Sequence, residues 1–295
     1  MARIIAGLGS PHAPAVGAAV DRNDEESPYW KPLFDGYKPM REWLARERPD
    51  VIILFTNDHF TSFFLDFIPT FAIAVAGRHE IADEGWGKRP LPEVPGHTDL
   101  AGHLAQQLVD GGFDLAVCHR LPLDHGSLSP LSALMPHVKQ WPVCVVPILV
   151  NVLHFPIPSA ARCFQLGRAI RRAVACYEDD LKVAVLGTGG LSHQLAGERF
   201  GLVDPAWDAE FLDRLESDPE SLAALSHREL IERGGTEGVE VIMWLCMRGA
   251  LSERVRRVHR NYYHATLTGY AQVIFEDTEN LPRADDPATR LVPPR

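Results

Sequence analysis

The sequence is poor in cysteine, in long apolar runs and in positive charge, and each shortage argues against a class of protein. Only five of its 295 residues are cysteines, and none forms a CxxC pair, which argues against a disulfide scaffold and favours a cytoplasmic protein with reduced thiols. No apolar run reaches the roughly 20 residues of a membrane span, and Met1–Ser10 is too short an apolar stretch for a signal peptide. The formal net charge of −10 argues against a broad surface for nucleic acid.

A local basic run, Arg254–Arg260 (RVRRVHR), departs from this acidic background. Short runs of like charge usually lie on a solvated surface, so we interpret this one as the exposed end of a helix. It does not predict a nucleic-acid site.

Strand-like apolar segments alternate with helical patterns along the chain. Continuous apolar strands between helices indicate a mostly parallel central sheet covered by helices on both faces, so the expected fold class is α/β. We expect a single domain over residues 1–277, with a long Gly- and Pro-rich loop at Arg78–His97 and a polar, Pro-rich tail at residues 278–295. The expected strands are Ala2–Leu8, Asp50–Phe55, Phe113–Cys118, Val143–Val150, Leu181–Leu186 and Gln272–Phe275. The expected helices lie within Tyr29–Arg46, Thr98–Val109, Ser159–Tyr177, Ala206–Leu215, Ser226–Arg233 and Gly238–Arg248.

Four of the expected strands are each followed by a histidine. In open α/β sheets, ligands bind beyond the carboxyl ends of the strands. A lone histidine is more often structural than functional, but four histidines at one edge of a sheet predict a site. These histidines are His12, His59, His125 and His193.

Neutral imidazole is a good ligand for iron, copper, zinc and nickel. Two histidines and one carboxylate on one face of the ion form the facial triad of non-heme Fe(II) oxygenases, with positions left open for substrate and O₂. His12 and His59 are candidates for the two histidines. The carboxylate has two candidates: Glu240, whose apolar neighbours would make a bare charge costly, and Glu237, which could instead complement a helix dipole. The pattern favours Glu240 without excluding Glu237.

The segment Gly187–Leu195 (GTGGLSHQL) follows an expected strand, as a phosphate-binding loop would. The Lys-Ser/Thr pair of a P-loop does not follow the glycines, which argues against nucleotide binding. We expect the glycines to let the chain turn tightly off the strand and to bring His193 to the site.

Taken together, nine motifs make the chain resemble the class III extradiol ring-cleavage dioxygenases, above all the protocatechuate 4,5-dioxygenase β subunit and the gallate dioxygenases. The resemblance implies an Fe(II) enzyme that opens a catecholic ring with O₂. It implies that His12, His59 and Glu240 bind the iron, that His193 is the active-site base and that His125 is a second active-site histidine. The motifs are SPHAP (10–14), YWKPLFDGY (29–37), NDH (57–59), IPTFAI (68–73), ADEGWG (82–87), LDHG (123–126), GTGGLSHQL (187–195), EGVEVIMWL (237–245) and MRGAL (247–251).

The resemblance also bears on substrate and partners. Protocatechuate enzymes of this family carry a Ser-Asn pair that holds the substrate carboxylate, and Thr266 and Leu267 stand in its place within residues 263–270 (YHATLTGY). We therefore expect Thr266 and Leu267 to bind a catecholic acid of the protocatechuate, gallate or 3-O-methylgallate type. A homo-oligomer is expected, with or without a small separate α subunit.

Two other classes of function fit the same residues. Zinc also accepts two histidines and a glutamate with an open position, which would suit a zinc-dependent hydrolase or lyase. A non-enzymatic binding protein could share the fold, because a fold does not determine a function. A pure binding protein would have no need of a base opposite a metal, which favours the enzyme.

Overall fold

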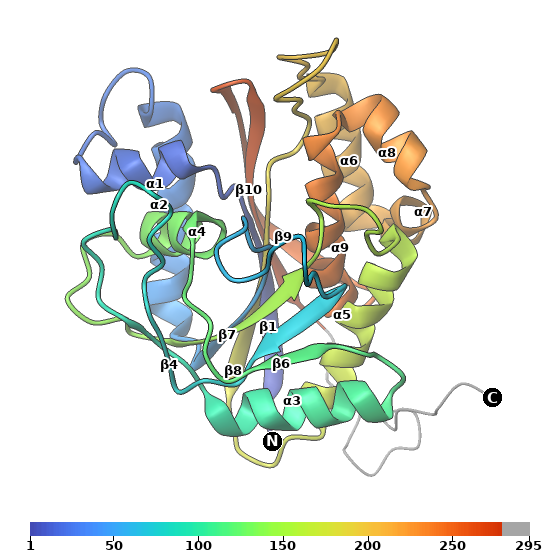
Figure 1. Cartoon of the computed structure of the whole chain (residues 1–295). Coiled ribbons are helices and arrows are strands. Elements are labelled where there is room, and N and C mark those ends of the chain that lie inside the picture. Colours follow the sequence, from blue (N-terminus) through green and yellow to red (C-terminus); the bar gives the residue numbers. More distant parts are fainter. Residues whose placement is uncertain (279–295) are drawn as a thin grey trace.

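An eight-stranded sheet with the order β6-β3-β7-β2-β8-β1-β10-β9 runs through the molecule (Figure 1). The computed structural model describes residues 1–278, so all but the first residue of the expected tail lies outside the described residues. The strands are β1 (Arg3–Ser10), β2 (Val51–Thr56), β3 (Phe71–Ala74), β4 (Arg78–His79), β5 (Val94–Pro95), β6 (Ala116–Cys118), β7 (Cys144–Val150), β8 (Lys182–Thr188), β9 (Val255–Ala265) and β10 (Thr268–Asp277). The helices are α1 (Pro14–Asp21), α2 (Lys31–Glu47), α3 (Thr98–Asp110), α4 (His125–Leu134), α5 (Ala160–Ala175), α6 (Pro205–Ser217), α7 (Pro219–Ala223), α8 (His227–Gly234), the 3-10 turn η1 (Glu237–Glu240) and α9 (Val241–Gly249).

The centre of the sheet is parallel and its flanks are not. Strands β7, β2, β8 and β1 run in one direction. On one flank, β3 pairs antiparallel with β7, and β6 pairs parallel with β3. On the other flank, β10 pairs antiparallel with β1 and forms an antiparallel hairpin with β9. The expected α/β class with a mostly parallel sheet is confirmed, and the antiparallel flanks are an addition to it.

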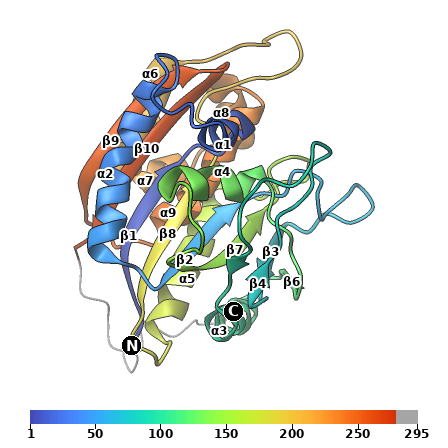
Figure 2. The same cartoon turned by 90° about the vertical axis from the view of Figure 1, so that its left-hand side faces the viewer.

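Helices cover both faces of the sheet, as the two views show (Figures 1 and 2). Strand β2 is buried on both sides because its side chains alternate between two cores. Val51, Ile53 and Phe55 pack with residues of α3 and α5 to α9, whereas Ile52 and Leu54 pack with residues of α1, α2 and α4. Alternation along a pleated strand produces this division.

The interpretation of Arg254–Arg260 as a helix end is wrong, because these residues open the edge strand β9. The register pairs Arg256 with Glu276 of β10. Farther along β9, Arg260 forms an ion pair with Asp213 of α6. Charged side chains on an exposed edge strand discourage pairing with another chain, so a strand can carry a run of charge as well as a helix can.

Within residues 1–278, no helix is long and apolar enough to cross a lipid bilayer.

Helices α5 and α9 approach so closely that their contact allows only glycine. A Cβ atom on Gly167 would lie 2.1 Å from the carbonyl oxygen of Cys246, and one on Gly249 would lie 2.2 Å from that of Phe164. Backbone atoms cannot move aside as a side chain can. The position of α9, which follows Glu240 directly, therefore depends on these glycines.

Replacing Gly167 with alanine is expected to lower the free energy of unfolding by about 1–3 kcal/mol, because the added methyl group would overpack the contact between α5 and α9. Urea unfolding measures the change. The control is Gly102→Ala on the exposed face of α3, where a Cβ would meet nothing within 4 Å. Because alanine has a higher helix propensity than glycine, Gly102→Ala should raise the free energy of unfolding by up to about 1 kcal/mol. Equal effects of the two substitutions would contradict the packing argument.

Candidate metal centre and active site

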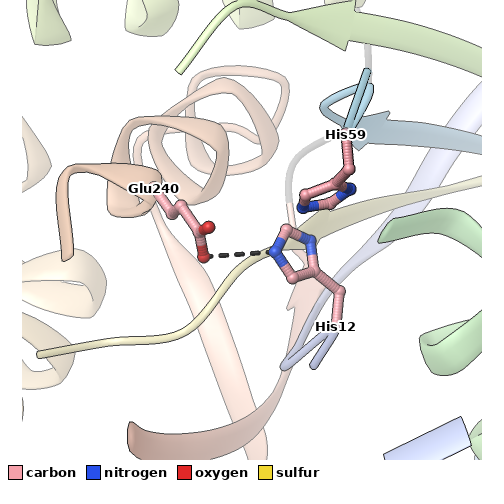
Figure 3. A group of neighbouring side chains, drawn as sticks. All are labelled: His12, His59 and Glu240. Atoms are coloured by element: carbon pink, nitrogen blue, oxygen red, sulfur yellow. Dashed lines mark ion pairs between the residues drawn. The ribbon is translucent and has the colours of Figure 1, made fainter. Parts of the chain in front are cut away.

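Three potential metal ligands from distant parts of the sequence meet at the carboxyl end of the parallel strands (Figure 3). His12 follows β1, His59 follows β2, and Glu240 closes η1. One ligand atom from each lies within 4.8 Å of the others. Such a set of two imidazoles and one carboxylate suits iron or zinc, so the residues fit a catalytic metal.

The hydrogen bonds around His12 determine its tautomer. The hydroxyl group of Thr188 donates to the carbonyl oxygen of Phe55 at 3.0 Å, and its oxygen lies 3.1 Å from Nδ1 of His12. Since a hydroxyl group has one proton, Thr188 must accept from Nδ1–H of His12. The Nε2 atom of His12 is then the one turned to the site, 3.1 Å from Oε2 of Glu240 (Figure 3).

Asp124 orients His59 in a similar way. Its Oδ2 accepts from the backbone N–H of His59 at 2.7 Å and lies 3.1 Å from Nδ1 of the ring. A carboxylate only accepts, so Nδ1 carries the proton, and Nε2 accepts from the side-chain amide of Asn57, whose Nδ2 lies 3.1 Å away. Burial by itself would raise the pKa of Asp124, but the charge and hydrogen bond of His59 outweigh it and lower the pKa to about 2.

Glu240 and Glu237 have different surroundings, which separates the two candidates for the carboxylate. Glu240 is buried, with Oε2 accepting from the backbone N–H of Gly190 at 2.9 Å. Burial would raise its pKa, yet the charge and hydrogen bond of His12 hold the pKa well below its usual range. Glu237 instead accepts from the backbone N–H of Leu195 at 3.0 Å. The structure therefore brings Glu240, and not Glu237, to the two histidines.

His193 lies across the same carboxylate. Its Nδ1 lies 2.9 Å from the carbonyl oxygen of Leu191, which can only accept, so Nδ1 is the protonated nitrogen. Its Nε2 is therefore unprotonated in the neutral ring and lies 3.8 Å from Oε2 of Glu240. This geometry suits a base whose lone pair is turned toward the candidate metal ligands.

The glycine-rich turn before His193 serves the carboxylate and not a phosphate. The N–H of Gly190 donates to Glu240, and Gly189 has a φ of +124°, which other residues rarely adopt. A Cβ on Gly190 would lie 2.8 Å from Cε1 of His193 and 2.7 Å from Cγ2 of Thr268. Because they lack a Cβ atom, the glycines allow their turn to lie close to both His193 and the β9–β10 hairpin.

His125 reaches the site by a different route from the one that the strand pattern predicts. Strand β6 runs antiparallel to β2, so its carboxyl end lies at the opposite edge of the sheet from His12 and His59. Residues 119–124 then return the chain to the edge where the histidines meet. A bridge between Leu123 and Ile81 supports this return. His125 then begins α4 with its ring centroid 3.8 Å from that of His59.

Thr266 and Leu267 form the turn between β9 and β10. Both have a positive φ, 48° and 64°, and the exposed fraction of Leu267 is 40%. The hydroxyl group of Tyr29 accepts from the backbone N–H of Thr266 at 2.9 Å. Next to the turn, Thr268 forms a β-bridge with His193, so the two candidate substrate residues lie beside the candidate base.

Two residues with clear roles in this geometry, Asp124 and Thr188, were missed by the sequence analysis. Asp124 stands in the motif LDHG and is an N-cap of α4, a signal that the residue order alone contains. Thr188 has no such signal, because its link to His12 joins residues 176 positions apart.

Replacing Asp124 with asparagine is expected to weaken binding of a divalent metal about 10- to 100-fold, because the carboxylate that orients His59 is lost. Competition with a chelator measures the affinity, and Asp66→Asn, at an exposed position, is the control.

Because the pKa of Asp124 is lowered, its stabilising effect is present above about pH 4 and is lost toward pH 2. Metal-free Asp124→Asn should therefore lose less stability than the wild type over that range; unchanged metal affinity would contradict the proposed orientation of His59.

Two dioxygenases are similar to this chain in sequence. A gallate dioxygenase from Pseudomonas putida is 49% identical over 199 residues, which cover 68% of this chain and 58% of that protein. The match thus spans less than two thirds of that relative. A 2,3-dihydroxyphenylpropionate/2,3-dihydroxicinnamic acid 1,2-dioxygenase from Photorhabdus laumondii is 29% identical over 285 residues, covering 80% of this chain and 87% of that protein.

A solved structure supports the fold. The crystal structure of an uncharacterized protein from Escherichia coli K12 superposes with a TM-score of 0.58 at 15% identity, covering 91% of this chain and 99% of that one. The family model described as the catalytic LigB subunit of aromatic ring-opening dioxygenase matches residues 6–275. The chain therefore belongs to the LigB family of aromatic ring-opening dioxygenases, for which a catalytic metal is expected.

Proposed function

We propose that this protein opens the ring of a gallate-like catecholic acid beside its diol, with both atoms of O₂ entering the product. One observation carries the proposal: Nε2 of His193 lies 3.8 Å from Oε2 of Glu240, the carboxylate that groups with His12 and His59. A binding protein has no use for a base aimed at a metal. Membership of the LigB family and the match to a gallate dioxygenase support the reaction and the substrate class.

The metal we propose is Fe(II), held by His12, His59 and Glu240. The donor set suits it, since two histidines and a carboxylate are the ligands of non-heme Fe(II) oxygenases. When bound, Fe(II) would supply a Lewis acid that lowers the pKa of the two catechol hydroxyl groups and a path for electrons between ring and O₂.

The chain's own residues would move the protons. His193 takes a proton from a substrate hydroxyl at Nε2, because Nδ1 is held by the carbonyl oxygen of Leu191. His125 lies against His59, and its Nε2 would take up a substrate proton and then deliver it to the oxygen atoms that enter the ring. The two histidines thus have separate tasks at one site.

The substrate carboxylate would lie at the β9–β10 turn. Thr266 is β-branched and has a φ of 48°, a strained conformation that is more often found where function requires it. Its hydroxyl group bonds that of Tyr270. Leu267 offers no hydrogen bond where protocatechuate enzymes of the family have asparagine, which favours gallate-type acids over protocatechuate.

Location and assembly are further proposals. None of the five cysteines, all within residues 1–278, forms a disulfide, which fits the cytoplasm. We also propose a homo-oligomer, with or without a small α subunit, from the resemblance to protocatechuate 4,5-dioxygenase.

Anaerobic loading with Fe(II), followed by measurement of O₂ consumption, tests the reaction. We expect uptake with gallate and 3-O-methylgallate to exceed uptake with protocatechuate and plain catechol. Thr266→Ala should raise KM for gallate about tenfold, since a hydrogen bond to a charged group contributes roughly 1.5 kcal/mol or more, and should leave KM for catechol unchanged. The reaction class is contradicted if no catechol supports O₂ uptake, or if zinc supports a reaction without O₂.

Replacing His193 with alanine should lower kcat about 10²- to 10⁴-fold, the usual contribution of a positioned base. Iron content should stay at the wild-type level, because His193 is not among the proposed ligands. His119→Ala, at an exposed position, is the control. Loss of iron from His193→Ala, measured by metal analysis, would show that the residue is a ligand and that the assignment as base is wrong.

A further inference from the structure

The long loop between β4 and β5 sends one carboxylate into the site. Glu84 has a side chain only 8% exposed, and both of its oxygens bond His125. Oε1 bonds Nδ1 of the ring, and Oε2 accepts from the backbone N–H of His125 at 3.0 Å. This second bond lies at the first residue of α4, where the helix dipole favours negative charge.

The loop is built to hold Glu84 at this place. On its amino side, Ala82 donates to the carbonyl oxygen of Leu123 at 2.9 Å, and Leu123 donates to that of Glu80 at 2.8 Å. On its carboxyl side, Asp83 Oδ1 accepts from the N–H groups of the two glycines that follow, both at 2.9 Å. These glycines have φ values of +96° and +92°, so other residues would strain the turn.

Arg89 fastens the far side of the same loop to the helices beside the site. Its guanidinium group bonds both oxygens of Asp21 in α1, at 2.7 and 2.8 Å. It also donates to the carbonyl oxygen of Gly17 and to the hydroxyl group of Ser132 in α4, each at 2.9 Å. The loop therefore cannot shift without breaking contacts to the helices that follow His12 and begin with His125.

The bond from Glu84 to Nδ1 determines which nitrogen of His125 carries the proton. Because a carboxylate only accepts, Nδ1 keeps a proton and Nε2 is left for a ligand. In the part of the chain that the structure describes, Nε2 of His125 has no hydrogen-bond partner, although the ring lies 3.8 Å from that of His59. Asp124 orients His59 by the same kind of contact. The site thus contains two carboxylate–histidine pairs side by side.

We propose that Glu84 is a positioning residue for ring cleavage, which sets the tautomer and orientation of His125 so that its Nε2 meets the oxygen atoms of the reaction. The proposal rests on the proposed function. It differs from a purely structural role, in which Glu84 would anchor the loop and have no effect on the ring of His125.

The test compares Glu84→Ala and Glu84→Gln with Glu80→Gln, a control in the same loop whose side chain pairs with Arg120 and Lys88 at the surface. Nitrogen-15 NMR of the metal-free, histidine-labelled proteins reports the tautomer, with the His125 signals assigned from a His125→Gln variant. We expect the Nδ1–H tautomer in the wild type and in the control, and a mixture of tautomers in Glu84→Ala. We expect kcat of Glu84→Ala to fall about 10- to 100-fold with iron content and KM unchanged. Glu84→Gln, which can still accept from Nδ1–H, should recover part of the loss.

Three results would overturn the proposal. One is a wild-type tautomer of His125 in Glu84→Ala, whether or not kcat falls. Another is a fall of kcat as large in Glu84→Gln as in Glu84→Ala. The third applies if Glu84→Ala does not fold: wild-type kcat and a wild-type tautomer of His125 in Glu84→Met, whose side chain has a similar length but offers no oxygen to accept from Nδ1–H. If the wild-type protein shows no O₂ uptake, the proposed function fails, and the tautomer of His125 still decides whether Glu84 positions the ring.

Discussion

The buried carboxylate of Glu240 is the constraint around which the site is assembled. A buried charge is costly unless it is paired and hydrogen-bonded, and Glu240 has both kinds of partner, His12 and the N–H of Gly190. The bond from Gly190 requires the chain to turn sharply at the end of β8, and Trp244 of α9 fixes that turn by donating to the carbonyl oxygen of Gly189 at 3.2 Å. Strand, turn and helix therefore have to meet at one place for the carboxylate to remain charged.

A common rule governs the histidines of the site. Each has one ring nitrogen held by an acceptor from the surrounding structure, and these acceptors differ in kind: a hydroxyl group, a carbonyl oxygen and two carboxylates. The consequence is the same in every case: the second nitrogen, Nε2, is the one that a metal ion or a reacting proton would meet. Control of tautomers by the surrounding groups is common for metal-binding histidines, and here it extends to the two histidines proposed to move protons. The acceptors are Thr188 for His12, Asp124 for His59, Leu191 for His193 and Glu84 for His125.

Local sequence patterns predicted the elements of the sheet centre well, because apolar runs such as Asp50–Phe55 are long and are flanked by polar turns. They failed where the pattern is ambiguous. Arg254–Arg260 carries charge at a density that suits a helix end or an edge strand equally, and only its pairing with β10 decides for the strand. The placement of His125 at the site was predicted for a wrong reason, since the direction of β6 depends on β3, a four-residue strand that the patterns did not identify.

The residue types of the site and the family follow from residue order alone, since the histidines, the glycine-rich turn and the motifs around them are local properties of the chain. Residue order also favoured Glu240 over Glu237 through its apolar neighbours. Which glutamate faces His12 depends on the folded arrangement, and so does the contact of Glu84 with His125, across 41 positions of the chain. The physical reason is that periodicity and capping report on neighbours along the chain, whereas hydrogen bonds between loops depend on where the whole sheet places them.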